Sequence, residues 1–210
     1  MFINYNRENI IKNISIYFDK TQSELIAHLN LDNSTSTPKN IRNIISKSLF
    51  TLIEKENIQK IENIILRTIR IDYKSNPIES ISFSQIKYIE IVNEEWHQSY
   101  LCKILNSEFL FFIFQTKSKD DNNPKLINAK FWKMNSDDLG YAEKFWELTK
   151  DSIQRGDYNN FITEKNDFIL HVRPKAKNKN DLMMTPQGYL QPKKAYWLNS
   201  SYIKSKIIDQ

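Results

Sequence analysis

The chain contains very little glycine and cysteine, with 3 glycines and 1 cysteine in 210 residues. It has neither a G-x-G-x-x-G nor a G-x-x-x-x-G-K-[ST] pattern, which argues against a glycine-rich loop that binds nucleotide phosphates. The single Cys102 allows no internal disulfide and no thiolate metal cluster, and this fits a reducing cytoplasm. We expect Cys102 to pack as a small core residue.

Long apolar runs and metal-binding histidine patterns are also missing. No apolar stretch approaches the roughly 18 residues of a membrane span, and the N-terminus has no apolar signal-peptide region. We therefore expect a soluble, cytoplasmic protein with no membrane partner. The histidines His28, His97 and His171 show neither HxH nor HxxxH spacing, which argues against a zinc site.

What the chain does have is an excess of positive charge. Its 30 lysines and arginines against 25 aspartates and glutamates give a formal net charge of +5, which favours a polyanionic partner. The length suits one domain. We predict a single DNA-binding domain over 1–210, with a helical cap over 1–57 and a sheet core over 58–210.

Hydrophobic periodicity predicts a mixed α/β (α+β) fold with a central sheet flanked by helices. Thr21-Gln22-Ser23-Glu24 is a capping box that begins a helix, and Thr37-Pro38 opens the next one. The strands are expected at Ile61–Ile71, Glu108–Gln115, Leu126–Met134 and Ala195–Leu198. A long amphipathic helix is expected over Asn135–Arg155, with Ser136 as N-cap, Leu148 in its buried stripe and Gly156 at its end.

The stretch from Phe168 to Asn199 carries the most chemistry. An apolar strand through Val172 gives way to a series of basic residues and then to a glycine turn. Cations at the end of a strand, with a tyrosine nearby, suit phosphate contacts and reading of base edges. A plain solvated basic loop is the alternative. The candidate DNA-binding residues are Arg173, Pro174, Lys175, Lys177, Lys179, Tyr189, Lys193 and Lys194.

This segment resembles the DNA-reading region of the MutH family, which comprises a mismatch-repair nicking endonuclease and restriction enzymes that cut GATC. The similarity rests on HVRPKAKN followed by a G-Y-L…K-K segment, and it extends over roughly Ile61 to Ile203. The resemblance implies a restriction-endonuclease-like fold with a DNA-binding cleft. It also implies that Arg173, Pro174, Lys175 and Tyr189 line the major-groove side of a GATC site.

The family's active site, as the resemblance implies, is an Asp followed by Glu-x-Lys on one strand. Two carboxylates hold Mg²⁺ against the scissile phosphate, and the lysine assists the attacking water. Glu and Lys at i and i+2 project from the same face of a strand.

This sequence departs from that pattern. Ile65 and Arg67 stand at the Glu and Lys positions, and Asn57 and Ile58 stand where the Asp is expected. Isoleucine cannot bind Mg²⁺, and arginine stays protonated and cannot act as a general base. Lys103 falls on a further lysine of the family's site, but one lysine does not restore a metal centre.

The same decayed strand occurs in the C-terminal, regulatory half of the two-part restriction enzymes that cut GATC, and ILRTIRI, NEEW and EFLFFIF resemble segments of that half. The resemblance therefore implies an allosteric, non-catalytic domain of a restriction-modification system that binds double-stranded DNA. Its partner would be a catalytic MutH-like domain or the second subunit of a dimer. We predict no cofactor. The alternatives are an active Mg²⁺-dependent endonuclease that recruits other acids, such as Glu56 or Glu62, and a protein-interaction domain.

Overall fold

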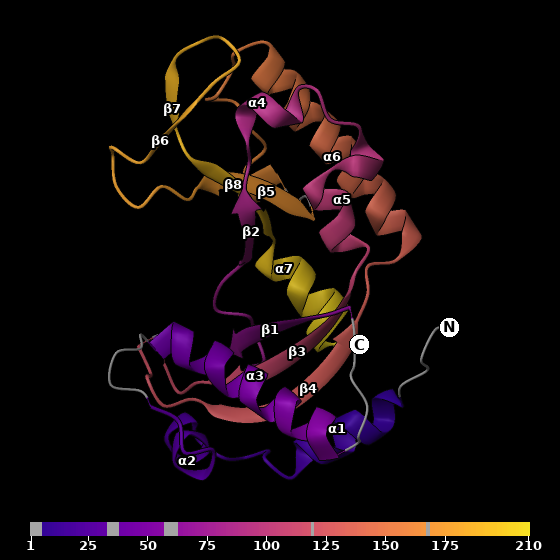
Figure 1. Ribbon diagram of the computed structural model, residues 1–210, viewed down its shortest axis with the longest axis vertical. Helices are drawn as coiled ribbons and strands as arrows, with labels where there is room; N and C mark the ends of the chain where they lie inside the picture. The colour runs from indigo at the N-terminus through magenta and orange to yellow at the C-terminus, as the bar shows by residue number, and fades with distance from the viewer. Residues whose placement is uncertain (1–5, 33–37, 57–62, 119, 167–168) are drawn as a thin grey trace. The chain divides into compact units, whose positions relative to one another are not determined.

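The structure is a computed structural model that describes residues 6–32, 38–56, 63–118, 120–166 and 169–210. The chain divides into two compact units (Figure 1). Unit 1 comprises residues 1–79 with 107–133, and unit 2 comprises 80–106 with 134–210. The expectation of a single DNA-binding domain, with a helical cap over 1–57 and a sheet core over 58–210, stays a prediction.

Unit 1 is a mixed sheet with helices against it. Strands β1 (Ile64–Ile71), β3 (Glu108–Gln115) and β4 (Lys125–Trp132) lie in the order β1-β3-β4. β1 pairs with β3 in parallel, and β3 pairs with β4 antiparallel. The helices are α1 (Arg7–Ser15), α2 (Gln22–His28) and α3 (Pro38–Glu56). The capping box of α2 forms as expected, because Thr21 accepts from the Glu24 amide while the Glu24 carboxylate accepts from the Thr21 amide.

The core of unit 1 follows from strand alternation. Side chains on one face of β3 meet the apolar faces of α1, α2 and α3. This cluster contains Ile10, Ile14, Leu25, Ile45, Leu49, Ile53, Leu110, Phe112, Phe114 and Leu126. The other face of the sheet carries the aromatic rings of Phe109, Phe111 and Trp132, which contact one another. Burial on both faces explains why β3 is apolar without interruption.

Unit 2 contains an antiparallel sheet of β2 (Ile81–Gln85), β8 (Lys194–Leu198) and β5 (Leu170–Pro174), in the order β2-β8-β5. A separate hairpin joins β6 (Leu182–Met184) to β7 (Leu190–Pro192). The helices are α4 (Tyr88–Ile91), α5 (Tyr100–Leu105), α6 (Ser136–Gln154) and α7 (Ser200–Ile203). Short helical turns occupy Trp96–Gln98, Glu164–Asn166 and Lys204–Ile208.

Helix α6 departs from its prediction at two positions. The N-cap is Asn135 rather than Ser136, because the Asn135 side chain accepts from the Asp138 amide. Leu148, which we expected in the buried stripe, is 51% exposed. The predicted end of the helix is confirmed, since Gly156 takes a positive φ of 74° that favours glycine.

The predicted mixed α/β class is confirmed, because unit 1 combines parallel and antiparallel strand pairs with packed helices. Among the residues that the structure describes, no helix is long and apolar enough to cross a membrane.

Candidate nucleic-acid interface

All eight predicted DNA-binding residues lie in unit 2, on one continuous segment that runs from β5 through the β6–β7 hairpin to β8 (Figure 1). β5 and β8 are antiparallel neighbours, and Arg173 pairs with Ala195 while Pro174 pairs with Lys194. The basic ends of the two strands therefore meet at one end of the sheet.

Arg173 is held in place by an aromatic ring. Its guanidinium lies over the indole of Trp197, 4.3 Å from the ring centroid, and its side chain is exposed. Stacking engages the flat face of the guanidinium and leaves its in-plane N–H donors directed outward. The buried His171 ring also stacks against this indole, with the two ring centroids 6.3 Å apart. These contacts with Trp197 therefore orient the Arg173 guanidinium before any ligand binds.

Burial determines the state of His171. Desolvation lowers the pKa of this imidazole below its ordinary value, and a hydrogen bond between its Nδ1 and Asn199 opposes that effect. At neutral pH the ring is therefore uncharged, so it packs beside Arg173 without like-charge repulsion.

Pro174 does not end the backbone pairing of β5 with β8, because the next residue continues it. The Lys175 amide donates to the carbonyl of Lys193 at 2.9 Å. The Lys175 side chain turns inward, and its ammonium donates to the carbonyl of Phe83 on β2. The first lysine after the strand thus ties β5 to β2 in this conformation.

The loop after Lys175 is organised around one carboxylate. Asp181 accepts from the Lys177 amide at 2.9 Å and forms an ion pair with the Lys193 ammonium. The hydrogen bond from Lys193, followed by that from the Lys177 amide, lowers the pKa of Asp181 below its ordinary value. The side chains of Lys177 and Lys179 are exposed on this loop.

Lys194 is also engaged within the protein. Its ammonium donates to the backbone carbonyl of Tyr158 and lies 4.7 Å from the centroid of the Phe161 ring. Burial lowers the pKa of this amine. The predicted cations therefore separate into two classes. Arg173, Lys177 and Lys179 project outward, whereas the ammonium groups of Lys175, Lys193 and Lys194 bind groups of unit 2.

The β6–β7 hairpin is braced at its tip. Gln187 donates to the carbonyl of Ile153 at 2.8 Å and accepts from the Tyr158 hydroxyl at 2.9 Å. The Tyr189 hydroxyl donates to the carbonyl of Gly156 at 3.2 Å. The predicted base-reading Tyr189 is therefore anchored to the end of α6, while its side chain remains 40% exposed.

The base of the hairpin is held by Tyr88, whose hydroxyl donates to the carbonyl of Pro192 at 2.7 Å. Tyr88 is fully buried. Tyr88→Phe should lower the free energy of unfolding by about 1–2 kcal/mol, because it removes the hydrogen bond between the buried Tyr88 side chain and the Pro192 carbonyl. Urea unfolding measures this loss, and limited proteolysis should show faster cleavage in the hairpin.

The matched control is Tyr100→Phe, because Tyr100 is 42% exposed and the same atom is removed. This change should alter stability by less than about 0.5 kcal/mol. Equal effects of the two variants would show that the Tyr88 bond does not hold the hairpin.

Sequence reasoning missed the groups that position the cations. Trp197 was not among the predicted DNA-binding residues, and its contact with Arg173 depends on the β5–β8 register. Asp181 belongs to no recognisable sequence motif that would mark it as the partner of Lys193. Gln187 looks like any polar turn residue, and only its bonds to Ile153 and Tyr158 reveal its role.

The positions of the family's Glu-x-Lys lie on β1, inside unit 1. Ile65 and Arg67 are two residues apart, so they share a face, and they pair with Phe109 and Phe111 of β3. The Nε atom of Arg67 is buried, and no hydrogen-bond partner for it occurs among the described residues. Lys103 lies on α5 in unit 2. The expected Asp positions, Asn57 and Ile58, and the acid Glu62 lie outside the described residues.

These residues do not form a metal site by themselves. Isoleucine offers no oxygen ligand, and a guanidinium repels a divalent cation. Within the described part of the chain, no three His, Cys, Asp or Glu side chains gather closely enough to hold an ion.

Comparison with known proteins extends this picture. The family model described as DNA mismatch repair enzyme MutH matches residues 53–143, a range that contains β1, β3 and β4. The chain is 25% identical over 199 residues to the type II restriction enzyme Sau3AI of Staphylococcus aureus, covering 74% of this chain and 40% of that enzyme. It is 24% identical over 128 residues to the DNA mismatch repair protein MutH of Shewanella woodyi, covering 60% of this chain and 55% of that protein.

The chain thus spans between 40% and 55% of the length of these relatives. The family model stops before the basic segment, whereas the strand with the altered Glu-x-Lys positions lies inside it. The resemblance first suggested by the basic segment is therefore supported by a separate part of the sequence, and the chain is similar both to MutH and to a type II restriction enzyme.

Proposed function

We propose that this chain binds double-stranded DNA at a GATC-like site, as the regulatory or recognition domain of a MutH-like type II restriction endonuclease. The observation that carries the proposal is Arg173, an exposed guanidinium held by Trp197 at the end of β5. Oriented guanidinium N–H donors suit guanine O6 and N7 in the major groove. Lys177 and Lys179 extend from the adjoining loop and are suited to phosphates.

The regulatory role is supported by the chemistry of β1. A family that cleaves through paired carboxylates needs oxygen ligands where this chain has Ile65, and a titratable lysine where it has Arg67. A domain with this strand can keep the fold and the DNA surface while a catalytic partner domain, or the second subunit of a dimer, cuts. In this proposal DNA binding by the domain controls cutting elsewhere.

Two measurements test the proposal. Fluorescence anisotropy with a GATC duplex and a scrambled duplex should show tighter binding to GATC at fixed salt, since salt changes both affinities. A plasmid assay with Mg²⁺ or Mn²⁺ should show no nicking by the purified chain. Equal affinity for both duplexes argues against sequence reading. Nicking that Glu62→Ala abolishes would establish the other candidate, an endonuclease with unusual acids.

A further inference from the structure

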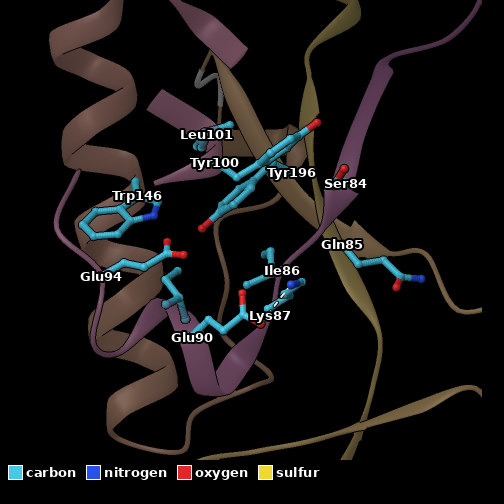
Figure 2. Close-up of a pocket in the computed structure, with 11 residues that line it drawn as sticks. Ser84, Gln85, Ile86, Lys87, Glu90, Glu94, Tyr100, Leu101, Trp146 and Tyr196 are labelled. Atoms are coloured by element: carbon cyan, nitrogen blue, oxygen red, sulfur yellow. Dashed lines mark hydrogen bonds and ion pairs between the residues drawn. The ribbon is translucent and has the colours of Figure 1, made fainter. Parts of the chain in front are cut away.

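A pocket of about 220 Å³ lies within unit 2, between β2, α4, α5, α6 and β8 (Figure 2). An engineered cavity of about 150 Å³ holds a benzene molecule, so this space has room for a ligand of benzene size or slightly larger. Its walls combine apolar and charged groups. The pocket is lined by Ser84, Gln85, Ile86, Lys87, Glu90, Ile91, Glu94, Tyr100, Leu101, Trp146 and Tyr196.

This pocket is separate from the candidate DNA surface. Side chains alternate along β8, so Tyr196 projects from the opposite face of the sheet to Trp197. The Arg173 guanidinium stacks on Trp197, whereas Tyr196 lines the pocket. A ligand in the pocket therefore does not compete for the groups that we assign to DNA.

Tyr196 is a buried residue of the pocket wall. Tyr196 is 4% exposed, and its oxygen is buried with no hydrogen-bond partner among the residues that the structure describes. Burial, followed by the charge of Glu94, raises the pKa of this phenol well above its ordinary value. A buried hydroxyl without a partner is costly, and buried polar groups in native proteins are usually hydrogen-bonded to protein atoms or to ordered water.

The Glu94 carboxylate is in a similar position. It is half-buried, and within the described ranges no hydrogen bond or ion pair reaches its oxygens. Glu90 already has a partner, because it forms an ion pair with Lys87 at 2.9 Å. The nearby Lys150 donates its ammonium to the backbone carbonyl of Glu94 and not to the carboxylate. Figure 2 shows the Glu94 carboxylate directed toward the space that Tyr196 lines.

The remaining walls are apolar. Ile86, Ile91, Leu101 and Trp146 are all buried and offer contact to an alkyl chain. The Trp146 ring already attracts one ammonium, since the Nζ of Lys150 lies 5.2 Å from its centroid. An alkyl stem against these side chains would bring a compact cation to Glu94 and the Tyr196 hydroxyl.

We propose that this pocket binds a primary alkylammonium group, with the ammonium donating to the Glu94 carboxylate and the Tyr196 hydroxyl while the alkyl stem packs against Trp146. An ammonium has three donors and no acceptor, which matches a carboxylate and a phenolic oxygen to which no side chain in the described ranges donates. The same chemistry is offered by a free amine and by a lysine side chain of another protein.

The test is an NMR titration of the purified chain with n-butylammonium, with the neutral n-butanol as the matched probe. Butylammonium should bind saturably and at least about tenfold more tightly than butanol, because a hydrogen bond to a charged group is worth more than a neutral one. Glu94→Gln should weaken the amine about tenfold, and Tyr196→Phe roughly threefold. Glu95→Gln, which removes the same charge from an exposed neighbour outside the pocket, should leave binding unchanged.

Equal binding of butanol, equal losses in Glu94→Gln and Glu95→Gln, or no saturable binding would each overturn the proposal, since ordered water alone would then satisfy Tyr196. A second pair of probes separates the two sources. Tighter binding of putrescine identifies a free amine, and tighter binding of a blocked lysine identifies a protein side chain. The test does not involve DNA, so it is independent of the proposed function.

Discussion

Replacing Arg173 with alanine is expected to weaken binding to a GATC duplex by about 1–3 kcal/mol and to remove the preference over a scrambled duplex. The reason is that the guanidinium is already oriented by Trp197, 4.3 Å from its ring centroid, so little rotamer freedom is lost on binding. Anisotropy titrations of both duplexes at several salt concentrations measure this effect.

Two further variants distinguish base reading from simple attraction. Arg173→Lys keeps the charge but loses the planar donor pair, so it should retain non-specific affinity and lose GATC preference. Lys179→Ala removes an exposed loop cation and should weaken both duplexes alike, reducing the slope of log K against log salt by about 0.9. If Arg173→Ala and Lys179→Ala behave identically on both duplexes, Arg173 binds phosphate and does not read bases.

The largest expected effect on stability is at Asp138, in the first turn of α6. This carboxylate accepts from the Tyr202 hydroxyl at 2.8 Å and from the Asn135 side chain at 2.8 Å. Asp138→Ala should lower the free energy of unfolding by about 2–4 kcal/mol, because it removes the acceptor of the buried Tyr202 hydroxyl and weakens the cap of the helix. Chemical denaturation monitored by circular dichroism measures the loss.

A double-mutant cycle isolates the contact between α6 and α7. Tyr202→Phe alone should cost about 1–2 kcal/mol, and the double variant should cost less than the sum of the single losses. The control Asp137→Ala removes an exposed acid from the same helical turn and should cost less than about 1 kcal/mol. Additive losses would show that the Asp138–Tyr202 hydrogen bond contributes nothing of its own.

Local signals in the sequence predicted much of the fold. The capping box at Thr21 and Glu24, the continuous apolar run of β3 and the end of α6 at Gly156 all depend on residues within a few positions of one another. Leu148 shows the limit of that reasoning. Helical spacing placed it in the buried stripe, yet it is 51% exposed, because burial depends on which side of α6 other elements cover.

The candidate site shows the same division. The sequence alone determined which functional groups this protein has. It has a basic strand end followed by a glycine turn, and it has Ile65 and Arg67 at the Glu-x-Lys positions of the MutH family. Only the tertiary structure decided which cations face outward, because their partners are distant in the chain. Lys193 pairs with Asp181 12 residues away, and Lys194 reaches the Tyr158 carbonyl 36 residues away. Strand register, which no short window of sequence contains, placed Trp197 against Arg173 and left Tyr196 on the opposite face of β8, where it lines a pocket.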